Sequence, residues 1–145
     1  MSTSVSNRSR GLGRVLVIVY ALLAIAATGR SVFQLIDDFE KAPIAYSLSA
    51  LAAVIYLVAT VALVAPGSIW YRVAVITISF ELIGVLVVGT LSIFDPVLFP
   101  AKTVWSFYGR GYAFVPLVLP ILGLIWLRLQ RPATSETHGA VDAAV

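Results

Sequence analysis

The sequence predicts an all-α polytopic membrane protein, a four-transmembrane-helix bundle, on three observations. Hydrophobic residues make up 60% of the 145-residue chain and charged residues only 12%, whereas about a quarter of an ordinary soluble domain is charged. The apolar residues gather into four blocks whose lengths suit a hydrocarbon core about 30 Å thick. Most basic residues stand at the ends of these blocks, as the positive-inside rule expects. One bundle uses nearly the whole chain and leaves no room for a second domain.

Residues 1–14 are small and polar with three arginines, so we expect a disordered, basic start held at the lipid headgroups. The first span is placed at 15–36, and it carries Arg30 and Gln34 in its outer end, where a long side chain can snorkel to the interface. This start also resembles a secretory signal, and its cleavage would leave three spans. We expect an intact first helix, because the helical pattern continues past the small residues.

The second span, 44–65, has no charged residue and follows Pro43, which suits the first position of a helix. Pro66 and Gly67 end it in a tight turn, and the third span follows at 71–94.

The loop from 94 to 111 is rich in aromatic residues, which places it at the outer membrane surface, with a partly re-entrant path as an alternative. The fourth span, 112–127, is short and contains Pro116 and Pro120. Residues 129–145 are small and polar, and we expect a disordered tail.

The distribution of basic residues predicts the topology. Six arginines face one side, against Lys41, Lys102, Arg110 and the in-helix Arg30 on the other. Both termini are therefore expected in the cytoplasm, with the chain in the cell membrane. The pI near 9.5 reflects this topology, so the expected partner is the lipid bilayer and not nucleic acid.

Glu81 is the leading candidate for a functional residue, because it lies well inside the third apolar block. A charged side chain at that depth costs at least ~2.5 kcal/mol, so it needs a partner, a proton or a water-filled cavity. Tyr56 is expected at a similar depth and could donate a hydrogen bond; Thr77, one helical turn before Glu81, is a second possible donor. Alternatively, Glu81 is satisfied inside the bundle and only fixes helix register.

Arg30 is the one strongly basic residue within a span, and the helical rise places it roughly 10 Å from Glu81 along the membrane normal. An Arg30–Glu81 pair is one hypothesis. The competing hypothesis pairs Arg30 with nearer polar residues, namely Asp37, Asp38 or Gln34.

Pro116 and Pro120 are predicted to break the fourth helix and to free the carbonyls of Tyr112 and Pro116. In a transporter such carbonyls can bind ions or substrate, but a kinked and packed helix is the favoured interpretation. Gly84 and Gly89 are expected to allow close contacts within the chain.

The sequence contains no catalytic set of residues and no cysteine, and its one histidine, His138, lies in the polar tail. We therefore expect no enzyme, no catalytic residues, no metal site and no cofactor. The favoured function is an accessory or scaffold subunit of a membrane complex, with a membrane-protein partner or a second copy of the chain. The alternative is a small proton- or cation-coupled transporter or channel that uses the intramembrane Glu81.

Five blocks of sequence carry a resemblance to a known group: ATGRS (27–31), APIAYSLSALAAVIYLVATVAL (42–63), FELIGVLVVGTLS (80–92), LFPAKTVWS (98–106) and GYAFVPLVLPILGL (111–124). They resemble an uncharacterised group of short four-span integral membrane proteins of high-GC Gram-positive bacteria. The resemblance implies the fold and a bacterial source, but no activity. The small multidrug resistance exporters are similar in having a glutamate in a four-span protein, but theirs is in the first helix. The DoxX-like four-helix membrane proteins are similar in size only.

Overall fold

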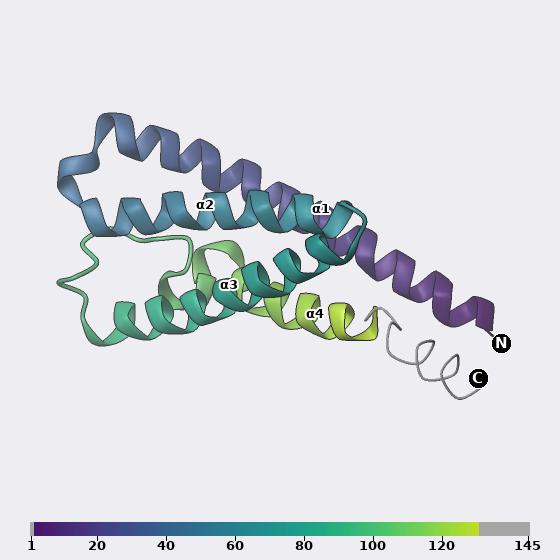
Figure 1. Ribbon diagram of the computed structural model, residues 1–145. Coiled ribbons are helices and arrows are strands. Elements are labelled where there is room, and N and C mark those ends of the chain that lie inside the picture. Colours follow the sequence, from purple (N-terminus) through teal and green to yellow (C-terminus); the bar gives the residue numbers. More distant parts are fainter. Residues whose placement is uncertain (1, 131–145) are drawn as a thin grey trace, which may run out of the picture.

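The computed structural model describes residues 2–130, and this part of the chain is all-helical, which confirms the predicted class. Four α-helices run alternately up and down beside one another (Figure 1). In chain order, the elements are α1 (Ser2–Asp37), η1 (Phe39–Lys41), α2 (Pro43–Val64), α3 (Ser68–Phe94), η2 (Ser106–Tyr112) and α4 (Val115–Leu129).

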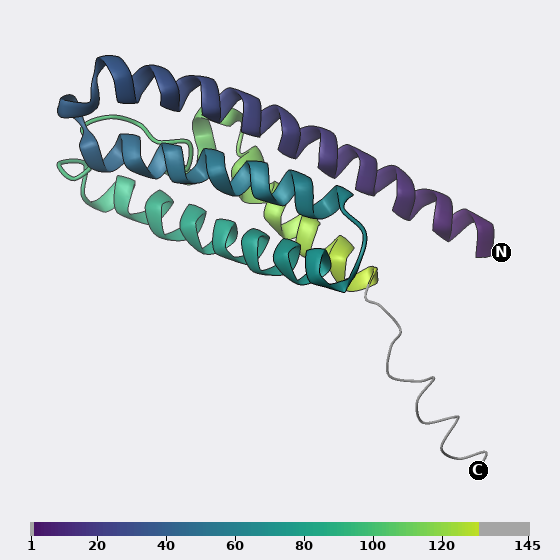
Figure 2. The same ribbon diagram turned by 45° about the horizontal axis from the view of Figure 1, so that its top comes forward.

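The two ends of the bundle differ. One end, here called the terminal end, holds the start of α1, the turn between α2 and α3, and the end of α4. The opposite end, here called the loop end, holds η1 and the long connection between α3 and α4. Figure 2 shows the same arrangement with α1 lying along the outer side of α2.

Three helical stretches are long and apolar enough to cross a membrane: residues 10–37, 43–64 and 68–94. A fourth crossing is possible only if η2 and α4, which are bent by 99° at their junction, count as one broken span. The outward side chains are also apolar, as with Ile25 (71% exposed) and Ile76 (69% exposed). Because a soluble protein rarely exposes so much continuous apolar surface, these features fit a multi-pass membrane protein.

Helix α1 is longer than predicted. The structure continues it back to Ser2, so the prediction of a disordered stretch over 1–14 is wrong for the residues described. In its first half, α1 packs against α4 at Gly13. A Cβ atom at Gly13 would lie only 2.6 Å from the Trp126 ring of α4.

Helices α2 and α3 match their predicted spans to within three residues. The predicted disorder of the tail concerns residues 131–145, which lie outside the described residues.

Small side chains bring α1 and α2 close together. The face of α2 that is turned inward is lined mainly by alanines, and α1 presents alanines in return. In a lipid environment there is no hydrophobic drive between helices, so close van der Waals packing between small residues holds them together. The buried alanines of the two helices, with Ser49 of α2, are Ala24, Ala27, Ala45, Ser49, Ala52, Ala53, Ala59 and Ala62.

The connection between α3 and α4 turns back into the bundle. Its residues 103–114, here called the inserted segment, carry Trp105 down to Gly84, ten residues before the end of α3 and so about 15 Å inside the loop end. Trp105 is 1% exposed. The prediction of a loop at the membrane surface is therefore wrong for this part, and the re-entrant alternative describes it.

Two hydrogen bonds join the inserted segment to α3. The backbone N–H of Phe107 donates to Ser92 Oγ at 2.8 Å, and the hydroxyls of Thr90 and Tyr108 are 2.9 Å apart. These contacts satisfy polar groups that would otherwise lie unpaired in an apolar environment.

The two central glycines of α3 make room for the inserted segment. A Cβ atom at Gly84 would lie 2.7 Å from the Trp105 ring, and one at Gly89 would lie 2.4 Å from the Tyr108 ring and 2.9 Å from its backbone nitrogen. The expectation that these glycines serve close contacts within the chain is confirmed.

The inserted segment has an unusual backbone. Phe107, Tyr108 and Gly109 are consecutive left-handed residues, and Ala113 and Phe114 are left-handed as well. Each such non-glycine residue costs on the order of 1–3 kcal/mol and persists only where its surroundings hold it.

Helix α4 starts after these residues, so the predicted fourth span at 112–127 begins three residues too early. Pro116 lies in the first turn, where proline is tolerated, and so does not break the helix. Only Pro120 lies inside α4 and frees a carbonyl, that of Pro116. Both prolines are buried, in agreement with the favoured interpretation of a packed helix.

We predict that Gly89→Ala lowers the free energy of unfolding by about 1–3 kcal/mol, because the added methyl group overlaps the backbone of Tyr108. The measurement is the midpoint of thermal unfolding in a mild detergent. Gly29→Ala is the matched control, since Gly29 lies in the exposed middle of α1 with no atom near its Cβ position. The control should leave the midpoint unchanged or raise it, because alanine favours a helix by about 1 kcal/mol over glycine. Equal midpoints for both variants would contradict the placement of the inserted segment.

Candidate functional site

Glu81 lies at the centre of α3, thirteen residues from each end of this 27-residue helix. The centre is therefore about 20 Å from either end of the helix. Its side chain is completely buried (0% exposed). The carboxyl group thus lies as far as possible from the two ends of this helix, as its place in the apolar block indicated.

Tyr20 of α1 is the partner of Glu81. Its hydroxyl donates a hydrogen bond of 2.7 Å to Glu81 Oε2, and the Tyr20 ring is completely buried as well. The second carboxyl oxygen, Oε1, is buried without a hydrogen-bond partner. A carboxyl group in this state can act as a neutral acid or accept one further polar ligand.

Tyr56 of α2 lies beside Tyr20, with their ring centres 6.3 Å apart, but its hydroxyl does not bind Glu81. It accepts a hydrogen bond of 2.9 Å from Trp105 Nε1 instead. The predicted Tyr56–Glu81 hydrogen bond is therefore wrong, because depth along a helix does not give the direction of a side chain, and the Tyr56 hydroxyl is directed at the indole of the inserted segment. Thr77, the second predicted donor, is half-buried and makes no hydrogen bond to Glu81.

The central polar cluster, here defined as Tyr20, Tyr56, Glu81 and Trp105, draws side chains from α1, α2, α3 and the inserted segment. Helix α4 also reaches it, because a Cβ atom at Gly123 would lie 3.7 Å from the Tyr20 hydroxyl. One cluster therefore touches every long element of the fold. Among the residues described, no group of three or more side chains that could hold a metal ion comes together.

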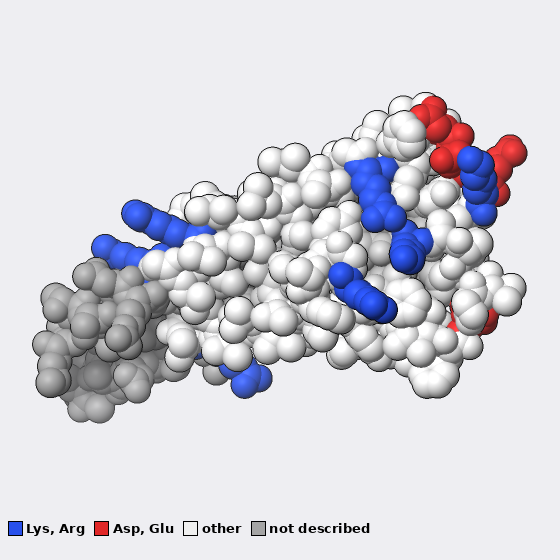
Figure 3. Space-filling model, turned by 180° about the vertical axis from the view of Figure 1, so that it is seen from behind, with Lys and Arg blue, Asp and Glu red and all other residues white. Residues whose placement is uncertain are grey.

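Arg30 does not pair with Glu81. Its guanidinium donates to the carbonyl of Lys102 at 2.9 Å and to the Tyr112 hydroxyl at 3.4 Å, so both contacts are with the α3–α4 connection. The competing pairs with Asp37, Asp38 and Gln34 are not formed either; Gln34 Oε1 is buried without a partner. Figure 3 shows several basic side chains close together in the middle of one face, while another basic side chain lies among the acidic ones at the edge.

Sequence reasoning identified Glu81 but missed Tyr20 and Trp105. Tyr20 lies within an uninterrupted apolar block, where a tyrosine signals little more than hydrophobic packing. The signal for Trp105 was present in the combination of Gly84 and Gly89 on α3 with the aromatic run at 105–108, since glycines on a membrane helix make room for large rings.

Comparisons with known proteins give no relative: no family model, no curated protein and no solved structure matches the chain.

We predict that Tyr20→Phe destabilises the protein by about 1–3 kcal/mol, because it leaves both carboxyl oxygens of Glu81 buried without a donor. In the double variant with Glu81→Leu the loss should be smaller than the sum of the two single losses, because both polar groups are then gone. The measurement is a double-mutant cycle of unfolding free energies in mixed micelles, with a coupling of about 0.6–2 kcal/mol expected.

The matched cycle uses Tyr56→Phe with Glu81→Leu. Since the Tyr56 hydroxyl binds Trp105, this pair should show little coupling. Stronger coupling of Glu81 to Tyr56 than to Tyr20 would show that the hydrogen bond is assigned to the wrong tyrosine.

Proposed function

We propose that the chain is an accessory subunit of a larger membrane complex and not an enzyme. It would be a four-span bundle of the bacterial cell membrane with both termini in the cytoplasm. The apolar outer surface and the excess of arginines at the terminal end support this setting. The central polar cluster supports a rigid body, because it ties the three long helices and the inserted segment together.

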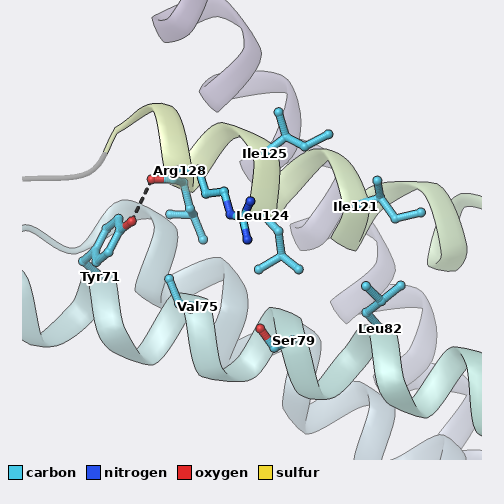
Figure 4. A pocket seen from close by; sticks show the side chains of 9 residues that line it. Tyr71, Val75, Ser79, Leu82, Ile121, Leu124, Ile125 and Arg128 are labelled. Atoms are coloured by element: carbon cyan, nitrogen blue, oxygen red, sulfur yellow. Dashed lines mark hydrogen bonds between the residues drawn. The ribbon is translucent and has the colours of Figure 1, made fainter.

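The partner would dock in a groove between α3 and α4 near the terminal end. This groove, with a volume of about 640 Å³, has apolar walls from both helices and the small Ser79 on its α3 side (Figure 4). At one end the Tyr71 hydroxyl donates to the carbonyl of Leu127 at 2.8 Å. At Ser79 the small side chain allows the close approach that helix packing in membranes requires, and the larger apolar side chains around it offer van der Waals contact.

Arg128 is the observation that carries the proposal. Arg128 is exposed at the open side of the groove, and its side chain lies back along the apolar groove beside Leu124 (Figure 4). No acidic side chain lines the groove, and the one ion pair among the residues described joins Lys41 and Asp38 at the loop end. A cation in apolar surroundings is stabilised by an anionic partner. We therefore propose that the occupant is a transmembrane helix of another membrane protein that carries an Asp or Glu near its cytoplasmic end.

A photoreactive side chain at Ile121, which lines the groove, should crosslink one membrane protein in native membranes, and the same group at Ile25 on α1 should not. Arg128→Asp should reduce this crosslink about tenfold, which corresponds to ~1.4 kcal/mol. Mass spectrometry of the crosslinked peptide then identifies the acidic residue of the partner. When this acidic residue of the partner is replaced by Arg, the Ile121 crosslink should return in the Arg128→Asp variant, because the two charges are then exchanged.

Crosslinks from Ile121 to lipid alone, or to a second copy of the chain, would contradict the proposed heteromeric partner. So would a crosslink that is insensitive to the charge at position 128.

A second candidate function, proton- or cation-coupled transport, is favoured by one observation. Glu81 Oε1 is buried without a hydrogen-bond partner, which leaves one position at the centre of the bundle where a proton or a cation could be held. Tyr20 would then orient the carboxyl group through the other oxygen.

Under this second proposal, Glu81→Gln should abolish pH-dependent flux in proteoliposomes, because an amide cannot exchange a proton in the same way. The variant should stay folded, since the amide oxygen still accepts the hydrogen bond from Tyr20. Thr77→Val, which removes a hydroxyl from the same helix without touching the Tyr20 contact, is the control and should keep its flux. Wild-type vesicles without pH-dependent flux, or unchanged flux in Glu81→Gln, would exclude the transport role.

A further inference from the structure

A second pocket, here called the loop-end pocket, lies beside the inserted segment on the opposite half of the molecule from the groove. Its volume is about 430 Å³. Three basic side chains line it, from three separate places in the sequence: Arg30 of α1, Lys102 before the inserted segment, and Arg110 of η2. Tyr112 and Phe107 add aromatic surface.

The positive charge of this pocket is not balanced within the described part of the chain. No acidic side chain lines the pocket, and none of its three cations takes part in an ion pair. The face drawn in Figure 3 shows the basic group separated from the acidic side chains. Like charges gathered in one cavity repel each other, so an anion bound between them would lower the energy of the folded state.

Arg30 is held ready for such an anion. Two of its N–H groups are used by the Lys102 carbonyl and the Tyr112 hydroxyl, which fixes the plane of the guanidinium. A guanidinium has five N–H donors, so three remain, and this planar arrangement suits the oxygens of a phosphate. Lys102 and Arg110 are exposed and make no side-chain hydrogen bond, so their charges are available at the mouth.

The depth of the pocket indicates the kind of anion. Arg30 lies seven residues before Asp37, so it is about 10 Å below the end of α1, close to the boundary between headgroups and hydrocarbon. The phosphate group of a membrane lipid lies in this region. The acyl chains of the lipid can then lie along the apolar outer surface of the bundle. Basic pockets between transmembrane helices on the cytoplasmic side bind anionic lipid headgroups, and the same pairing of charge with phosphate applies to this pocket on the opposite side.

We propose that the loop-end pocket binds the phosphate group of an anionic phospholipid, with Arg30 as the oriented donor and Lys102 and Arg110 as the charges at its mouth. The proposal is independent of the partner in the groove, because the two sites share no residue. Bound lipid would link α1 to the α3–α4 connection, and so would hold the inserted segment in place.

The test is binding of phosphatidylglycerol to the full-length chain in a neutral detergent, measured by native mass spectrometry and by the shift of the thermal midpoint. The double variant Lys102→Gln/Arg110→Gln should bind this lipid at least about tenfold more weakly, given ~1 kcal/mol for each basic residue near a lipid surface. Phosphatidylcholine should bind weakly to both proteins. Arg72→Gln, which removes an exposed arginine of α3 at the terminal end, is the matched control and should bind phosphatidylglycerol like the wild type.

Arg30→Lys tests the oriented donor, because lysine keeps the charge but loses the planar set of N–H groups. It should weaken phosphatidylglycerol binding, and the thermal midpoint without lipid reports separately on any loss of the Arg30 contacts. Unchanged binding in Lys102→Gln/Arg110→Gln, or an equal loss in Arg72→Gln, would overturn the proposal. Inorganic phosphate that displaces the lipid at comparable concentration would also overturn it, by showing a site for free phosphate.

Discussion

The structure depends on a hydrogen-bond donor for one buried carboxyl group, that of Glu81 at the centre of α3. Glu81 is completely buried at the midpoint of α3, and Tyr20 of α1, 61 positions earlier in the sequence, gives it one hydrogen bond. Because an unpaired polar group in hydrocarbon costs several kcal/mol, this bond fixes the rotation of α1 relative to α3. The indole of Trp105 and the hydroxyl of Tyr56 close the cluster from the side of α2 and the inserted segment.

The inserted segment obeys the same rule that buried polar groups need hydrogen-bond partners, and it occupies part of the space beside α4 in the bundle. Helix α4 has only 15 residues and so extends about 22 Å, less than the hydrocarbon thickness. The remaining space is filled by backbone that is not regularly helical. Its N–H groups at Phe107 and Thr103 donate to Ser92 Oγ and Ser106 Oγ, and Thr90 pairs with the Tyr108 hydroxyl. Glycines on α3 let it approach, so the strained residues 107–109 are held by contacts on both sides.

The sequence predicted those parts of the molecule that depend on a one-dimensional pattern. The spans are predicted by runs of apolar residues. Glu81 was recognised as a candidate site residue because it is the charged residue within such a run. The partner of Glu81 did not follow, because helical rise gives depth but not the rotation of a helix about its axis. Depth alone therefore could not decide which of Tyr20 and Tyr56 donates a hydrogen bond to Glu81. Arg30 was placed within possible reach of Glu81, but the inserted segment takes its hydrogen bonds. Left-handed backbone at Phe107 and Tyr108 has no sequence signal, since these residue types seldom adopt it.

The bend between η2 and α4 has a consequence for how the molecule is assembled. Helices α1, α2 and α3 each contain a stretch that is long and apolar enough to cross a bilayer by itself, whereas η2 and α4 reach that length only when the bent pair is counted together. In a two-stage view of membrane folding, the first three helices insert and then associate. The inserted segment and α4 can dock only after α3 is in place, because Trp105 and Tyr108 pack against Gly84 and Gly89 of α3. Helix α4 and the inserted segment follow α3 in the chain, so they are synthesised after the helix on which they dock, and this docking completes the core around Glu81.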